Sequence, residues 1–218
     1  MKTYPINLNI VGKRCIVVGG GKVAFRKIRD LLNAGAIVKV IAPKICADIE
    51  ELFQRGEIFL TRKNFSPDML DDEFILIAAT DNPEVNHLAT ESAQSKKILV
   101  NVVSGTGGNF FVPSKIQRGD LLLTISTGQN SPAFSKFVRL MLEDELDENF
   151  AKGLEVIAKR RQEVKQLLPN SQSRQKFWQE ILTPDIWKLL RTGQINLLEE
   201  LIDNALKSFG TQSYNSTH

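Results

Sequence analysis

Three consecutive glycines constrain this chain more than any other feature. Gly19, Gly20 and Gly21 follow the short apolar run from Arg14 to Val18 and precede a segment, Lys22 to Ala34, whose apolar residues recur at helical spacing. A buried strand that ends in glycines and leads into a helix is typical of a βαβ unit. The glycines therefore predict an α/β fold with a parallel sheet.

Gly19, Gly21 and Ala24 match the G-x-G-x-x-G/A pattern of dinucleotide-binding turns. In this pattern the first glycine permits a tight turn, the second lets the backbone approach a diphosphate, and the third small residue lets helix and strand pack closely. The N-terminus of the following helix offers free N–H groups and a partial positive charge to phosphates. The pattern predicts a dinucleotide site, and a purely structural turn is the alternative.

The second predicted strand, Val38 to Ile41, lacks one element of such a site. An acidic residue that binds the adenosine ribose is usual at this strand end, but the chain continues as Ala42-Pro43-Lys44. Either Lys44 favours a phosphorylated ribose, or Pro43 and Lys44 shape the adenosine pocket through their backbone. From these residues alone, NAD and NADP both stay open.

Alternating strand and helix patterns continue over the first 125 or so residues. Asn82-Pro83 opens one of the helices, with Asn82 as its N-cap. The expected elements are helix 46–55, strand 58–61, strand 74–79, helix 83–95, strand 98–103, and short strands at 110–112 and 121–126. Beyond them, Ser131-Pro132 opens a helix with Phe134, Phe137, Val138 and Met141 on one side, and the chain is helical in pattern from Phe150 onward.

Composition excludes several classes of protein. The 218 residues are 42% apolar and 24% charged, which is ordinary for a globular protein, and no stretch reaches the ~18 apolar residues of a membrane helix. The N-terminus lacks the apolar stretch of a signal peptide, so we expect a cytoplasmic protein. A net charge of +3 without a basic stripe does not favour nucleic acid. Two histidines and two separate cysteines, Cys15 and Cys46, predict no metal site and no disulfide.

The segment Gly19 to Lys27 resembles the G-G-G-x-V-A-x-R-K signature of the sirohaem synthase family. Its members are precorrin-2 dehydrogenases and sometimes also sirohydrochlorin ferrochelatases. The resemblance covers roughly residues 4 to 190, and its further segments are Val40-Ile41-Ala42-Pro43, Ala78-Ala79-Thr80-Asp81, Asn101-Val102-Val103, Phe111-Val112-Pro113-Ser114, Ser126-Thr127-Gly128, Ser131-Pro132, and Arg174 with Phe177-Trp178.

The resemblance implies NAD-dependent oxidation of precorrin-2, an anionic tetrapyrrole, to sirohydrochlorin by a homodimer. Together with the element patterns it leads us to expect a Rossmann domain at 1–112, a small β-containing dimerisation and substrate region at 113–148 and a helical C-terminal domain at 149–210. The polar composition of residues 211–218 predicts a disordered tail. We expect the stand-alone form of the family, without the methyltransferase domain of larger members. The expected cofactor contacts are Gly19, Gly21, Lys22, Val23, Pro43, Lys44, Thr80 and Asn101.

Ser104 departs from the family where chemistry is expected. The family usually has an aspartate after Asn101-Val102-Val103, proposed as a base and sometimes as a chelatase residue. A neutral hydroxyl cannot replace a carboxylate as base or metal ligand. Either positioning and the cofactor's own chemistry suffice, or Asp81 or Asp120 serves, or metal chelation has been lost. We expect dehydrogenation without strong ferrochelatase activity, with Ser104 and Asp81 as candidate catalytic residues.

Ser126 and Thr127 precede the helix that Ser131 opens, where a substrate carboxylate could dock beside Lys136. The alternative is a structural loop with Ser131 as the N-cap. Two further functions compete with the dehydrogenase. One is a nucleotide-sensing module that uses the glycine turn without redox chemistry, and the other is a tetrapyrrole-binding scaffold without catalysis.

Overall fold

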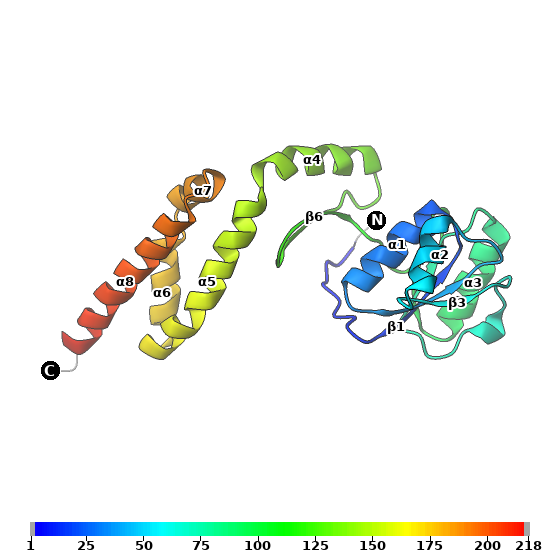
Figure 1. The fold of residues 1–218 in the computed structure, drawn as a ribbon, viewed down its shortest axis with the longest axis horizontal. Helices are drawn as coiled ribbons and strands as arrows, with labels where there is room; N and C mark the ends of the chain where they lie inside the picture. The colour runs from blue at the N-terminus through cyan, green and yellow to red at the C-terminus, as the bar shows by residue number, and fades with distance from the viewer. Residues whose placement is uncertain (1–2, 216–218) are drawn as a thin grey trace. The chain divides into compact units, whose positions relative to one another are not determined.

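The computed structural model describes residues 3–215, which divide into two compact units between Val112 and Pro113 (Figure 1). The first unit contains a five-stranded parallel sheet in the order β3-β2-β1-β4-β5. Its strands are β1 Arg14–Val18, β2 Ile37–Ile41, β3 Phe59–Thr61, β4 Ile75–Ala78 and β5 Leu99–Val102. Successive strands from β1 to β3 are added on one side of β1, and β4 and β5 are added on its other side, so the order of strand addition reverses between β1 and β4. In parallel sheets of this kind, ligands bind outside the carboxyl ends of the strands at this switch point.

Helices cover both faces of this sheet. Val17 of β1 packs in one cluster with Ile28 of α1 (Lys22–Asn33) and with residues of α2 (Ala47–Gln54). Its neighbour Val18 packs in a second cluster with Ala89 of α3 (Pro83–Ser95) and with residues near the short helix η1 (Pro67–Met69). Because both faces are buried, the central strands read as unbroken apolar runs, which is why the sequence predicts them.

The expected α3 is confirmed together with its cap. The Asn82 side chain accepts hydrogen bonds from the backbone N–H groups of Glu84, at 2.9 Å, and Val85, at 3.3 Å. Pro83 occupies the first helical position, where a missing N–H costs nothing.

The prediction of a strand at 110–112 is wrong. Phe110 and Asn109 instead donate their backbone N–H groups to the same Val100 carbonyl oxygen, at 3.3 Å and 2.9 Å, so the segment lies beside β5 without a regular ladder. The sequence also misses β6 (Ser114–Arg118), which pairs antiparallel with β7 (Leu121–Ile125). Within β6 only Ile116 is buried, so its pattern carries almost no apolar signal.

The second unit continues with five helices: α4 Pro132–Glu145, α5 Glu148–Leu167, α6 Ser171–Ile181, α7 Pro184–Arg191 and α8 Ile195–Asn215. Phe177 is fully buried in a core with Val164, Leu198 and Ile202. The tail expected to be disordered from 211 is helical as far as Asn215, and its last three residues, 216–218, lie outside the described part. None of the helices described is both long and apolar enough to cross a membrane.

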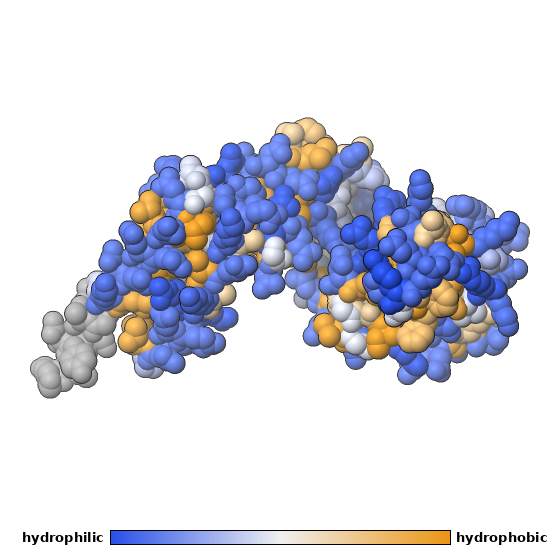
Figure 2. All heavy atoms as spheres, viewed as in Figure 1, coloured by the Kyte–Doolittle hydropathy of each residue, from blue (hydrophilic) through white to orange (hydrophobic). Residues whose placement is uncertain are grey.

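One side of α4 leaves its apolar side chains exposed. Phe134, Phe137 and Met141 are 56%, 54% and 53% exposed, and Leu140 lies beside them. Figure 2 shows hydrophobic residues gathered at the surface over this helix. The sequence predicts this apolar stripe, and a surface of this kind typically marks an interaction site.

Candidate functional site

The first glycine of the turn lies between two strand ends. Gly19 has a φ of +131°, and its N–H donates to the Ile41 carbonyl at the end of β2, at 3.0 Å. A Cβ atom at this position would lie 2.4 Å from the Ala79 carbonyl oxygen, which follows β4. Both the backbone conformation and the space therefore require glycine, as the pattern predicts.

Gly20 is also required, although the pattern leaves its position free. A Cβ atom at Gly20 would lie 1.9 Å from the Lys44 carbonyl oxygen, and the Gly20 carbonyl accepts a hydrogen bond from the Cys46 N–H, at 2.8 Å. The segment after β2 is thus packed directly on the turn. The only signal for this contact in the sequence is that the three glycines are consecutive.

Gly21 borders open space. It is the N-cap of α1, and a Cβ atom there would meet nothing within 4 Å. Within the described residues no side chain caps this helix, so its first N–H groups, which have no partner inside the helix, stay available to a ligand. An anion is favoured there by these donors and by the helix dipole. The turn therefore fits a dinucleotide diphosphate.

The residues around the turn take three different environments. Lys22 is exposed at the start of α1, Val23 is half-buried, and Ala24 is fully buried against the sheet. After β2, Pro43 and Lys44 are both exposed. The two lysines place positive charge on the segments that border the turn, which suits a phosphate-containing ligand.

Thr80 follows β4 and is engaged by the protein itself. Its hydroxyl donates to the Asn86 Oδ1 atom at 2.7 Å, and its N–H donates to the same atom at 3.1 Å. The Asn86 amide nitrogen donates back to the Thr80 carbonyl at 2.9 Å. A cofactor contact from the Thr80 side chain stays a prediction, and the contacts in the structure give this residue a structural task.

The other strand-end candidates differ in accessibility. Asn101 lies within β5, is 5% exposed, and donates its side-chain N–H to the Phe110 carbonyl at 3.1 Å. Asp81 and Ser104 are exposed beyond the ends of β4 and β5, which are neighbours in the sheet. Asp81 and Ser104 can therefore meet a ligand at the carboxyl edge, whereas Asn101 secures the loop that follows β5.

The second unit holds the residues expected to bind substrate. Thr127 donates its hydroxyl to the Ser131 carbonyl at 3.1 Å, and the Ser126 hydroxyl accepts from the Gly128 N–H at 3.2 Å. Ser131 accepts from the Phe134 N–H at 3.1 Å, which confirms it as the N-cap of α4. Ser126 and Lys136 are exposed, whereas the Thr127 hydroxyl is occupied by the loop. Their role in substrate binding stays a prediction.

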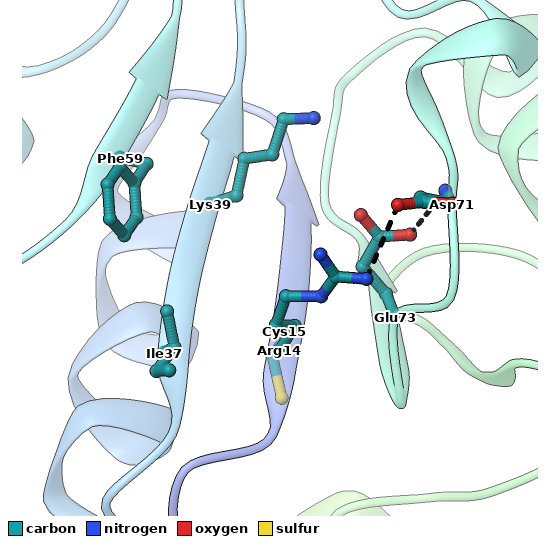
Figure 3. A pocket seen from close by; sticks show the side chains of 7 residues that line it. All are labelled: Arg14, Cys15, Ile37, Lys39, Phe59, Asp71 and Glu73. Carbon is teal, nitrogen blue, oxygen red and sulfur yellow. Dashed lines mark hydrogen bonds and ion pairs between the residues drawn. The ribbon is translucent and has the colours of Figure 1, made fainter.

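A small cavity of about 180 Å³ lies at the other end of the sheet (Figure 3). Arg14 and Ile37, which begin β1 and β2, line it together with Lys39, Phe59 and Glu73. The Lys39 ammonium donates to the Met69 carbonyl at 3.2 Å, and the Glu73 carboxylate accepts from the Asp71 N–H at 2.7 Å. Arg14 pairs with the Asp71 carboxylate at 3.4 Å, so each of these charged groups has a partner within the protein. The cavity lies at the opposite end of the strands from the glycine turn.

The part of the chain that the structure describes holds no cluster for a metal ion. Within residues 3–215 no three His, Cys, Asp or Glu side chains are placed to hold one.

Two family models match the chain. Residues 6–114 match a model described as "Putative NAD(P)-binding", and residues 154–206 match the sirohaem synthase dimerisation region. The first match contains the glycine turn and all five strands of the parallel sheet. The second lies in the helical part, further along the chain than the region 113–148 that the sequence leads us to assign to dimerisation.

Known proteins resemble the chain along most of its length. It is 34% identical over 213 residues to a siroheme synthase of Photorhabdus laumondii and 33% identical over 205 residues to one of Xylella fastidiosa, covering 97% and 93% of this chain. The matches cover 45% and 43% of those proteins, so the chain spans about half the length of these relatives.

A solved structure is similar over nearly the whole chain. SirC, a precorrin-2 dehydrogenase, has a TM-score of 0.76 and 27% identity, and the match covers 93% of this chain and 100% of that one. The turn geometry, the strand order and the family matches agree with one another. The chain therefore belongs to the sirohaem synthase family and carries its NAD(P)-binding domain.

Proposed function

We propose that this protein catalyses the NAD-dependent dehydrogenation of precorrin-2 to sirohydrochlorin in sirohaem biosynthesis. The observation that carries the proposal is the open glycine turn at the switch point of the sheet, in a chain that resembles SirC over 93% of its length. In this reaction a hydride leaves the tetrapyrrole for NAD, and a proton is released. Precorrin-2 and NAD thus become sirohydrochlorin and NADH.

The first task of the protein is to hold the cofactor. Backbone N–H groups at the start of α1 bind the diphosphate, and Gly21 leaves the space that this approach needs. Lys22 contributes positive charge, and Pro43 with Lys44 borders the adenosine in place of the usual acid. When bound, NAD supplies the hydride acceptor.

Proton handling falls to few groups. Asp81 is the exposed carboxylate beyond β4 and is the candidate to accept the released proton. Ser104, beyond β5, is a neutral hydroxyl and does not act as a base near neutral pH. We therefore infer that the hydride step depends mainly on the positioning of cofactor and substrate.

Ferrochelatase activity is the second candidate function, and we infer that it is weak or absent. Insertion of a metal ion into sirohydrochlorin needs a base for the pyrrole protons and a ligand for the incoming ion, and Ser104 supplies neither. Incubation with sirohydrochlorin and ferrous or cobaltous ion tests this inference. A rate well above the spontaneous one would contradict it.

We further propose a cytoplasmic homodimer that binds the substrate carboxylates through Ser126, Thr127 and Lys136. The match of residues 154–206 to a dimerisation region and the exposed apolar side of α4 support the dimer. Light scattering after size-exclusion chromatography measures the mass. Met141→Lys, on the exposed side of α4, should shift a dimer towards monomer, whereas Lys136→Ala should leave the mass unchanged.

One experiment separates the competing functions. The purified protein is incubated with precorrin-2 and either NAD or NADP, and formation of the reduced cofactor is followed by absorbance. We expect NADH to form with NAD. Tetrapyrrole binding without turnover would favour a scaffold, and cofactor binding without tetrapyrrole binding would favour a nucleotide-sensing module.

A further inference from the structure

We propose that Asn86 is a positioning residue for the dinucleotide turn, although it lies on α3, on the other face of the sheet from α1. This inference rests on the proposed NAD-dependent function. Asn86 reaches the turn through Thr80 and does not itself need to touch the cofactor.

The side chain of Asn86 is 3% exposed and satisfies every polar group of Thr80. Its Oδ1 atom accepts from the Thr80 N–H and hydroxyl, and its amide nitrogen donates to the Thr80 carbonyl. The oxygen and the nitrogen of the Asn86 amide thus bind the backbone N–H and the carbonyl of Thr80, as the backbone of a neighbouring strand would. A buried polar group without a partner is costly, so the amide keeps this orientation.

The segment that Asn86 holds is the wall of the glycine turn. Ala79 donates its N–H to the Val18 carbonyl at 2.8 Å. A Cβ atom at Gly19 would lie 2.4 Å from the Ala79 carbonyl oxygen and 3.2 Å from the Thr80 nitrogen. Because Gly19 is in such close contact with this peptide, a shift of Thr80 moves Gly19 and the start of α1 with it. Asn86 therefore fixes the donors that bind the diphosphate.

Thr90 supplies a matched control for a purely structural role. It lies one turn further along α3, is 3% exposed, and donates its hydroxyl to the Asn86 carbonyl at 2.7 Å. Thr90→Val removes a buried hydrogen bond from the same helix while leaving the Asn86 side chain in place. If Asn86 only stabilises α3, then Thr90→Val and an Asn86 variant should act alike.

The test uses Asn86→Leu, Asn86→Asp and Thr90→Val in the full chain, with the Kd for NAD, the KM values, kcat and Tm measured for each. We expect Asn86→Leu and Asn86→Asp to raise the Kd and KM for NAD about tenfold, because a displaced Thr80 shifts the start of α1, and to change the KM for precorrin-2 less than about twofold. Thr90→Val should lower Tm and leave the Kd for NAD within about twofold of wild type.

Asn86→Asp adds a second measurement, the pH dependence of NAD affinity, which a change in stability alone would not alter. This variant also tests the inference if Asn86→Leu fails to fold. Its ionised carboxylate keeps both acceptor bonds but repels the Thr80 carbonyl, whereas the protonated acid can donate to that oxygen as the amide does. NAD affinity of this variant should therefore recover as pH is lowered through the pKa of the new carboxyl, with no such recovery in wild type.

The outcomes are separable. Asn86 variants that bind NAD as wild type does, or a Thr90→Val variant that weakens NAD binding equally, would overturn the inference while leaving the proposed function intact. Wild-type protein that binds no NAD would overturn both.

Discussion

The Lys44 carbonyl oxygen lies so close to Gly20 that a Cβ atom at Gly20 would sit 1.9 Å from it. The neighbouring Gly21 is the opposite case, since a Cβ atom there would meet no atom within 4 Å. Two adjacent glycines of one turn thus serve different purposes. Gly20 lets the protein pack on itself, and Gly21 leaves room for a ligand.

Gly20→Ala should damage the fold and the cofactor site together. The added methyl group forces the Lys44 backbone away and strains the hydrogen bond from Cys46, a change that costs about 1–3 kcal/mol. Urea unfolding should therefore show a lower free energy of unfolding, and NAD titration a higher Kd. A variant with wild-type stability would mean that the Lys44 segment moves freely, contrary to this packing.

Gly21→Asp should separate stability from binding. Aspartate is a good N-cap and raises helix stability over glycine by a few tenths of a kcal/mol, so Tm should stay the same or rise slightly. The carboxylate would occupy and repel the diphosphate position, so NAD binding should be lost. Gly21→Ser is the neutral control and should weaken NAD binding less. Unchanged NAD affinity in Gly21→Asp would refute the role assigned to the turn.

An element of this fold can be predicted from the sequence where its burial requires a recognisable run of apolar residues. Strands β1 and β4 are covered on both faces, so their apolar runs are readable, and Asn82 before Pro83 marks a helix start by local chemistry alone. Strand β6 has one buried side chain, Ile116, so it has no such run. Contacts made along the sheet edge, such as those of Phe110, depend on neighbours distant in sequence.

The candidate site is predictable to a similar degree. The turn glycines are visible because a positive φ and a close approach restrict residue type locally. Asn101 and Thr80 attract attention as polar residues at strand ends, but their partners, the Phe110 carbonyl and the Asn86 amide, emerge only in three dimensions. For the same reason Asn86 has no signal in the sequence beyond one polar position in a helix.

Cys15 should remain unreactive while the protein is folded. Burial raises the pKa of its thiol from 9.0 to about 11, partly offset by a backbone hydrogen bond from Ile75, and the thiol is fully buried. Cys46 is half-buried. Alkylation of native protein near pH 8 should therefore modify Cys46 first, and both thiols should react in urea. Rapid modification of Cys15 without denaturant would contradict its burial.

The raised pKa of the Cys15 thiol also predicts a pH dependence of stability. Below pH 9 the Cys15 thiol is protonated in both the folded and unfolded chain, so its contribution is constant. Between 9 and about 11 the thiol ionises only in the unfolded chain, so the free energy of unfolding should fall as pH rises. Urea unfolding at several pH values measures the slope. Cys15→Ala should reduce that slope, and an equal slope would assign it to other groups.

Substitutions of Ser104 test whether dehydrogenation or metal insertion needs a carboxylate at this position. Because a serine hydroxyl neither accepts the released proton nor binds a metal ion at neutral pH, Ser104→Ala should leave kcat for NADH formation within about threefold of wild type. Ser104→Asp restores the carboxylate usual in the family and should raise metal insertion into sirohydrochlorin above the wild-type rate, since a carboxylate both takes a proton and binds cations.

Asp81→Asn is the matched change beyond the neighbouring strand β4. If Asp81 accepts the proton, this variant should lower kcat at least about tenfold and leave the Kd for NAD unchanged. A large loss of dehydrogenation in Ser104→Ala would show that the hydroxyl takes part, and an unaffected Asp81→Asn would leave positioning of cofactor and substrate as the source of the rate.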